Sequence, residues 1–163
     1  MIKVLFVCHG NICRSPMAEF IMKDMVKKLS VDDLFEIDSC ATSKEELGNS
    51  IYPSALKTLK SHGIFNANHT ARQITIHDYR YYDYIFIMDN YNLKMIKYVL
   101  NLDNYDKIKL IGDYLQPGLC IEDPWYSGNF DLVYEQLSCS IKKFLKEKLP
   151  EYHGSSIHSP GCK

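Results

Sequence analysis

The sequence predicts an α/β domain in which a parallel sheet is covered by helices. Short apolar runs alternate with segments of helical spacing along the chain, which is the pattern of β-α-β units. The length of 163 residues suits one domain with its own core, and we expect that domain over residues 1–150. Hydrophobic residues make up 46% of the chain and charged residues 24%, as in ordinary globular proteins.

Four apolar runs are predicted to be the strands. They are rich in Val, Ile, Phe and Leu, as expected for strands that are buried on both faces. Their residues are KVLFV (3–7), LFEIDSC (34–40), YIFIM (84–88) and KIKLI (107–111). Because ligands bind at the carboxyl ends of parallel strands, we expect the active groups at that edge.

Helical spacing occupies the intervals between these runs. The apolar positions that show it follow the first strand at 18, 21, 22, 25 and 29, and recur in a long last helix at 130, 133, 137, 141, 144 and 145. A helix over 53–64 is expected to end near Gly63. The aromatic run at 78–86 is interpreted as a connection into the third strand. After Leu149 the periodicity stops, and we expect a flexible tail over 151–163.

The overall charge and the cysteine pattern exclude several classes of protein. Lys and Arg number 19 against 20 Asp and Glu, so the net charge of -1 gives no nucleic-acid footprint. No apolar run approaches a membrane span, and MIKVLFVC is too short for a signal peptide, so no membrane partner is expected. The six cysteines are scattered rather than spaced as a disulfide framework, which favours a reducing cytoplasm.

The junction between the first strand and the first helix is built to bind an anion. Ser15 suits an N-cap and Pro16 the first helical position, so a helix is predicted to begin there. Its free N–H groups and positive dipole end then face the loop. Gly10 permits close approach of the backbone and Asn11 tolerates left-handed geometry, so the amides can form an anion nest.

Cys8 and Arg14 add chemistry to this loop. The Arg14 guanidinium can grip phosphate oxygens in a bidentate manner, and the positive field favours the thiolate form of Cys8. A nucleophile beside an oxyanion receptor predicts phosphoryl transfer through a cysteinyl-phosphate intermediate. A Walker A loop is excluded because no Gly-Lys-Ser/Thr follows, and no Cys/His pairs recur at zinc spacing, so no metal is expected.

The stretch VCHGNICRSPMAEFIM resembles the signature of the low-molecular-weight protein tyrosine phosphatases. Three further stretches resemble the same family: ATSKEELGNSIYPSALKTLKSHGI (41–64), HTARQIT (69–75) and EDPWYSG (122–128). The resemblance implies a single three-layer domain with a four-stranded parallel sheet flanked by helices. It also implies hydrolysis of phosphomonoesters without a metal or cofactor. The phosphate-binding loop after the first strand would be His9, Gly10, Asn11, Ile12, Cys13 and Arg14.

The resemblance implies roles for residues outside the nucleophile and the arginine. Asp123 matches the general acid, which protonates the leaving group and then activates water, with Glu122 as the second candidate. Ser15 matches a serine that stabilises the leaving thiolate. Asn11 and His69 match residues that hold the loop in shape.

The resemblance also bears on the substrate. Trp125 and Tyr126 match an aromatic pair, often Tyr-Tyr, that lines the substrate ring. Glu45 and Glu46 lie in the variable loop and would disfavour acidic neighbours of the phosphorylated residue or favour basic ones. Relatives that act on phosphoarginine carry threonine in place of Ile12, so we predict a preference for phosphotyrosine. The expected partner is a phosphotyrosine-containing protein, a tyrosine kinase being one candidate.

Three other functions remain as alternatives: a protein-arginine phosphatase, an arsenate reductase on the same fold, and a non-catalytic phosphotyrosine-binding module. The reductase would pass a disulfide to two cysteines after the third strand, and residues 89–119 contain none. A binding module would be expected to lack the nucleophile, the arginine or the acid, and all three are present.

Cys13 is not required for phosphoryl transfer. The resemblance implies that it protects the nucleophile, by trapping the sulfenic acid of oxidised Cys8 as a disulfide. The alternative is that Cys13 merely fills a small apolar gap under the loop.

Overall fold

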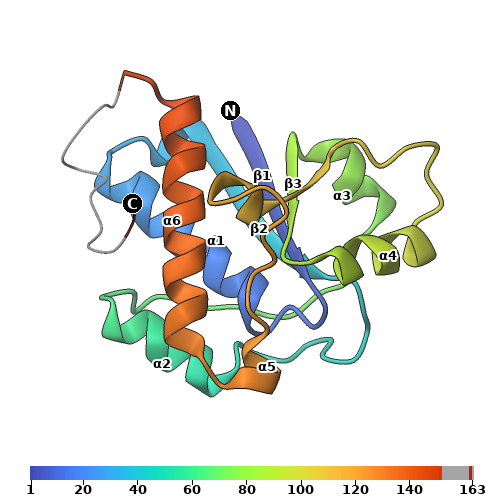
Figure 1. The fold of residues 1–163 in the computed structure, drawn as a ribbon, viewed down its shortest axis with the longest axis horizontal. Helices are drawn as coiled ribbons and strands as arrows, with labels where there is room; N and C mark the ends of the chain where they lie inside the picture. Colours follow the sequence, from blue (N-terminus) through green and yellow to red (C-terminus); the bar gives the residue numbers. More distant parts are fainter. Residues whose placement is uncertain (152–161, 163) are drawn as a thin grey trace.

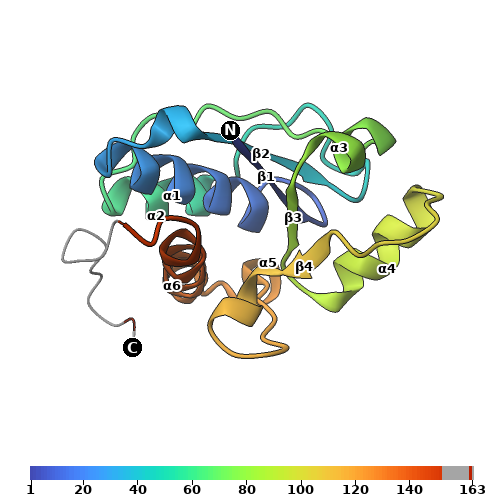
Figure 2. The same cartoon turned by 90° about the horizontal axis from the view of Figure 1, so that it is seen from above.

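The computed structural model describes residues 1–151 and 162, and it confirms the α/β architecture. The strands are β1 (Ile2–Cys8), β2 (Phe35–Ala41), β3 (Tyr84–Ile87) and β4 (Ile108–Leu110). The helices are α1 (Arg14–Lys28), α2 (Pro53–Ser61), α3 (Ile76–Tyr81), α4 (Asn90–Val99), α5 (Pro124–Ser127) and α6 (Phe130–Lys148), with 3-10 helices at Asp32–Leu34 and Ile111–Tyr114. All strand pairs are parallel, in the order β2-β1-β3-β4. Figure 1 shows the fold with β1, β2 and β3 labelled, and Figure 2 labels all four strands.

The helices lie on both faces of the sheet. Figure 2 shows α1, α2 and α6 on one side of the strands and α3 and α4 on the other. Alternate residues of β1 serve the two cores, because Val4 and Phe6 pack on the first side while Leu5 and Val7 pack on the second. In the part of the chain that the structure describes, no helix combines the length and the apolarity that crossing a bilayer requires.

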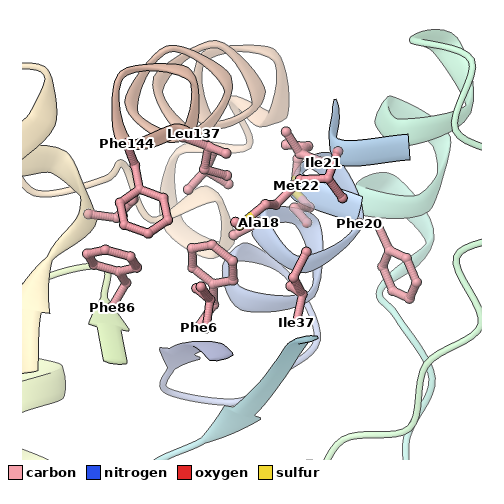
Figure 3. Close-up of a cluster of buried hydrophobic side chains, with 14 of the residues drawn as sticks. Phe6, Ala18, Phe20, Ile21, Met22, Ile37, Phe86, Leu137 and Phe144 are labelled. Atoms are coloured by element: carbon pink, nitrogen blue, oxygen red, sulfur yellow. The ribbon is translucent and has the colours of Figure 1, made fainter. Parts of the chain in front are cut away.

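Aromatic rings join the central strands to the last helix. The ring of Phe86 lies 5.0 Å from that of Phe144 at 80° and 5.9 Å from that of Phe6 (Figure 3). Each such pair contributes about 0.5–1.5 kcal/mol beyond the buried area. Since Phe6 lies two residues before Cys8, this packing holds the end of β1 in place.

The aromatic run at 78–86 leads into β3, as predicted. Its first part belongs to the helix α3, which was not predicted. A capping box starts that helix: the Thr75 hydroxyl accepts from the Asp78 backbone N–H, and the Asp78 carboxylate accepts from the Thr75 backbone N–H. The tyrosines masked this polar signal.

The structure joins Cys139 of α6 to Cys162 by a disulfide, with 5.5 Å between the two Cα atoms. The scattered cysteine pattern did not predict this bond. The tail expected over 151–163 falls mostly on residues 152–161 and 163, which lie outside the described residues.

Candidate active site

A pocket of about 460 Å³ lies where β1 and β3 end and α1 begins. Most of the predicted site residues line it, Glu46 of the variable loop among them. Asp89 and Tyr91 also line it, and neither was predicted to belong to the site. Its lining is Cys8, His9, Gly10, Ile12, Cys13, Arg14, Glu45, Glu46, Asp89, Tyr91, Asp123, Trp125 and Tyr126. Asn11 and Ser15 are fully buried beneath this lining.

The start of α1 differs from the prediction. The helix begins at Arg14, with Cys13 at the N-cap position, so Ser15 and Pro16 lie inside it. The N-cap prediction was therefore wrong. Ser15 does not cap the helix because its hydroxyl contacts the sulfur of Cys8, with 3.0 Å between Oγ and Sγ, rather than a backbone amide of its own helix.

Asn11 shapes the loop from within. Its backbone is left-handed, with a φ of 59°, as predicted. Its side-chain oxygen accepts from the Arg72 backbone N–H at 3.2 Å, which leaves the amide nitrogen to donate. That nitrogen donates to Ser15 Oγ at 2.8 Å and to Ser39 Oγ at 3.0 Å. The orientation of the amide is thus set by its backbone partner.

A buried carboxylate fixes the direction of this hydrogen-bond chain. The Ser39 hydroxyl donates to Glu19 Oε1 at 2.6 Å, and a carboxylate only accepts. Glu19 is 4% exposed, and Lys23 donates to its other oxygen at 2.6 Å. Since Ser15 Oγ accepts from Asn11, its own proton is left to point at Cys8 Sγ or at the Cys40 carbonyl oxygen, which lies 3.4 Å away. The chain therefore leaves the Ser15 hydroxyl able to donate to the sulfur of Cys8.

Three further contacts lie at the base of the loop. His69, whose side chain is 5% exposed, has Nε2 2.6 Å from the carbonyl oxygen of Asn11 and Nδ1 3.9 Å from Glu19 Oε1. The Asn11 backbone N–H donates to Cys8 Sγ at 3.3 Å. These contacts place His69 beneath the loop, where it can maintain the loop's shape.

Arg14 is held in one orientation at the pocket floor. Its Nη1 donates to Asp89 Oδ2 at 2.8 Å and to the Ile121 carbonyl at 3.1 Å, and its Nη2 lies 3.6 Å from Asp123 Oδ2. Burial opposes the charged guanidinium, but the charges of Cys8 and Asp89 outweigh it and raise the pKa of Arg14. The pocket floor therefore keeps a permanent cation.

Asp123 lines the pocket beside the Arg14 guanidinium. It is the N-cap of α5, where Oδ1 accepts from the Trp125 backbone N–H at 3.1 Å, and its side chain is 38% exposed. Glu122 is not among the residues that line the pocket. Its backbone N–H donates to the Gln136 side chain at 2.9 Å, away from Cys8. The geometry favours Asp123 over Glu122 as the acid.

The mouth of the pocket has an aromatic wall. Trp125 lies with its ring 5.4 Å from that of Tyr52, which stacks on Phe130 at 5.9 Å. Trp125 is 59% exposed and Tyr126 87% exposed. A substrate ring can therefore reach the supported face of Trp125, while Tyr126 extends toward solvent.

A second wall of the mouth is polar. His9 Nε2 lies 3.0 Å from Glu45 Oε2, and the His9 ring lies 6.2 Å from that of Tyr91 at 38°. Glu46 accepts from the Asn49 amide at 2.6 Å. A Cβ added at Gly10 would come within 3.3 Å of Glu46 Cγ, so the glycine allows this close approach.

Cys13 lies beside the nucleophile but in a different environment. It is 8% exposed and lines the same pocket. Burial, followed by the charge of Cys8, raises the pKa of Cys13 to about 12. Cys13 is therefore a neutral thiol at physiological pH.

Sequence reasoning missed several residues of the site. Ser39 and Glu19 support the loop from below, Asp89 holds Arg14, and Tyr91 lines the mouth. Asp89 had a readable signal, because it follows the third predicted strand at the edge where ligands bind. Glu19 had one as well: it is an acidic residue four positions after Ser15, on the buried side of the helix. Tyr91 carried no such signal.

Within residues 1–151 and 162, no group of three or more His, Cys, Asp and Glu side chains is arranged to hold a metal ion.

Comparison with known proteins gives a consistent result. The sequence model of the family described as low molecular weight phosphotyrosine protein phosphatase matches residues 3–152. A protein of that name from Schizosaccharomyces pombe is 42% identical over 150 residues, covering 89% of this chain and 96% of that protein.

Solved structures lead to the same family. The low molecular weight protein tyrosine phosphatase from Streptococcus pyogenes matches with a TM-score of 0.82 and 37% identity, over 94% of this chain and 100% of that one. A Drosophila arginine phosphatase matches with a TM-score of 0.80 and 37% identity, over 90% of this chain and 98% of that one.

Proposed function

The chain belongs to the low molecular weight phosphotyrosine protein phosphatase family, and we propose that it hydrolyses phosphotyrosine through Cys8, Arg14 and Asp123. The observation that carries these assignments is the contact between Cys8 Sγ and the Ser15 hydroxyl at 3.0 Å, inside a pocket that also holds Arg14 and Asp123. This site brings the hydrogen-bonded sulfur of Cys8 together with a fixed cation and a partly exposed carboxyl group.

In the first step, the Cys8 thiolate attacks phosphorus and forms an S–P bond. The bond from phosphorus to the phenolic oxygen breaks, and protonated Asp123 gives its proton to that oxygen. Arg14 and the loop amides hold the phosphoryl oxygens while charge redistributes. The products of this step are a cysteinyl-phosphate, tyrosine and an ionised Asp123.

In the second step, water attacks the cysteinyl-phosphate. Asp123 takes a proton from the water, the S–P bond breaks, and inorganic phosphate leaves. The electron pair returns to Cys8 Sγ, where the Ser15 hydroxyl and the Asn11 backbone N–H can stabilise the thiolate. The hydrogen-bond chain below the loop supports the proposal that Ser15 eases this departure.

The substrate is a phosphorylated tyrosine rather than a phosphorylated arginine. Ile12 lines the pocket with an apolar side chain, and the supported ring of Trp125 suits an aromatic leaving group. Because the chain also resembles an arginine phosphatase, phosphoarginine is the alternative substrate to test.

We expect a phosphotyrosyl peptide to be hydrolysed at least tenfold faster, in kcat/KM, than a phosphoarginyl peptide of the same sequence. The measurement is phosphate release from both peptides by the same enzyme preparation. Faster release from phosphoarginine would overturn the substrate assignment while leaving the role of Cys8 intact. Replacement of Ile12 by threonine should lower the ratio of kcat/KM for phosphotyrosine to kcat/KM for phosphoarginine. Ile12→Val serves as the matched apolar control.

The partners follow from the same chemistry. The substrate is a protein that carries phosphotyrosine, and a tyrosine kinase that phosphorylates itself is the partner we propose, acting together with this chain in the cytoplasm. The net charge of -1 supports the absence of a nucleic-acid partner.

Cys13 is assigned a protective role. Peroxide would oxidise the Cys8 thiolate to a sulfenic acid, and Cys13 would displace water from it to form a disulfide. A thiol reductant would then restore both thiols. Because burial raises the pKa of Cys13 to about 12, we expect this trapping to be slow compared with that by an exposed thiolate.

A further inference from the structure

The charges around the pocket do not balance. Four carboxylates line it, from Glu45, Glu46, Asp89 and Asp123. Arg14 lies 2.8 Å from an oxygen of Asp89 and 3.6 Å from one of Asp123. Glu45 and Glu46 thus form an acidic edge, on the loop after β2, that Arg14 does not pair with.

This acidic edge is open to a ligand. The Glu45 side chain is 69% exposed, and its Oε2 lies 3.0 Å from His9 Nε2 of the phosphate loop. Glu46 accepts from the neutral amide of Asn49. Among residues 1–151 and 162, Glu46 has no cationic partner, and the partner of Glu45 is an imidazole with a 36% exposed side chain.

A phosphate ester makes this imbalance larger. Its dianion enters a pocket floor that Arg14 and the loop amides match, but it also adds negative charge near Glu45 and Glu46. A cation carried by the same ligand would offset that repulsion over distances shorter than the Debye length of about 10 Å at 0.1 M salt. The phosphotyrosine ring is uncharged, so this cation must come from a residue next to the phosphotyrosine in the substrate.

We propose that Glu45 and Glu46 select phosphotyrosine that has a lysine or arginine beside it, and that this basic residue replaces His9 as the partner of Glu45. The inference rests on the proposed function and specifies its substrate class. Tyr91, which is 52% exposed and lies next to His9, offers an aromatic face along which the aliphatic stem of the basic side chain can lie.

The test uses three phosphotyrosyl peptides that differ only in the residues on either side of the phosphotyrosine: arginine, alanine or glutamate. The parent enzyme should have a kcat/KM about fivefold higher for the arginine peptide than for the glutamate peptide at low salt, as exposed ion pairs predict. The ratio should fall toward one at 1 M salt, where the Debye length is about 3 Å.

Variants locate the effect. Glu45→Gln and Glu46→Gln should each lower the arginine-to-glutamate ratio, and the double variant should bring it to about one. His9→Gln should raise the ratio, because a neutral side chain competes less for Glu45. Glu135→Gln, an exposed position on α6 with the same change of charge, should leave the ratio unchanged. Each variant is compared with itself, so a general loss of rate cancels.

The outcomes separate this inference from the proposed function. Equal hydrolysis of all three peptides by the parent, or an undiminished ratio in the double variant, would overturn the selection by Glu45 and Glu46. Failure of the parent to hydrolyse any phosphotyrosyl peptide would instead overturn the proposed function. If Glu135→Gln lowered the arginine-to-glutamate ratio as much as the Glu45 and Glu46 variants do, the preference would come from the net charge of the protein rather than from the mouth of the pocket.

Discussion

The floor and the mouth of the pocket are built in different ways. The floor is buried, and the partners of Asn11, Ser15 and Arg14 are other buried or half-buried groups of the same domain. The mouth is exposed and comes from separate segments, such as the loop after β2, α4 and α5. The difference suggests that the floor provides the chemistry common to the family, while the mouth sets which phosphoproteins this chain accepts.

Loss of the floor's reacting groups should have the largest effect. Cys8→Ser removes the nucleophile and Arg14→Ala removes the fixed cation, so each should reduce phosphotyrosine hydrolysis to background. Phosphate release from p-nitrophenyl phosphate and from a phosphotyrosyl peptide checks both variants. Residual turnover of Cys8→Ser within tenfold of the parent would show that another group starts the reaction.

Asp123 lies between the two regions, and its effect should depend on the leaving group. Asp123→Ala should lower kcat on phosphotyrosine by about 10²–10⁴-fold, the usual contribution of a general acid. The loss should be smaller on p-nitrophenyl phosphate, whose leaving group departs without a proton. The matched variant is Glu122→Ala, and equal losses on the two substrates would remove Asp123 from the donor role.

The hydrogen bonds that run from Asn11 through Ser39 to Glu19 should affect both the stability of the fold and the rate of hydrolysis. Glu19→Gln removes the acceptor-only end of the chain, and hydrogen bonds to charged groups contribute about 1.5–3 kcal/mol. We expect the free energy of unfolding to fall by about that amount and kcat to fall by about tenfold. Denaturant unfolding and steady-state kinetics measure both quantities.

Asp24→Asn is the control for Glu19→Gln. Asp24 lies on the same helix and pairs with Lys28 at 2.8 Å in an i,i+4 arrangement, which contributes about 0.3–0.5 kcal/mol. If the two variants lost equal stability and rate, Glu19 would act as a surface charge rather than as the end of a directed chain.

The smallest effect concerns recovery from oxidation. After peroxide treatment and then a thiol reductant, Cys13→Ser should regain a several-fold smaller fraction of its own starting activity than the parent regains. Phosphate, by filling the floor, should slow the inactivation of both. Equal recovery of parent and variant would leave Cys13 with a packing role only.

The sequence was informative about the floor because its residues are local. Cys8 to Ser15 are contiguous, and the alternation of strands and helices already placed them at the ligand edge of a parallel sheet. The start of the helix was misplaced because Ser15 has two possible uses, as a cap or as a partner of Cys8, and only the folded geometry decides between them.

The supporting residues were harder to predict because they are distant in the chain. Ser39 and Asp89 reach the floor only when β2 and β3 pair with β1, and the strand register brings Ser39 opposite Phe6. The pairing of His9 with Glu45 spans 36 positions and is set by how the loop after β2 folds. The sequence showed that Glu45 and Glu46 place acidic side chains in this loop, but it did not show that Glu45 contacts His9.

The disulfide between Cys139 and Cys162 makes the thermal stability of the purified protein depend on whether a reductant is present. It closes a loop over a sequence separation of 23, and a loop of that size restricts the unfolded chain by about 3 kcal/mol. A reductant that keeps Cys8 active also opens this bond. The same reagent should therefore raise specific activity and lower the melting temperature, so the most active preparation and the most heat-resistant one are different chemical species.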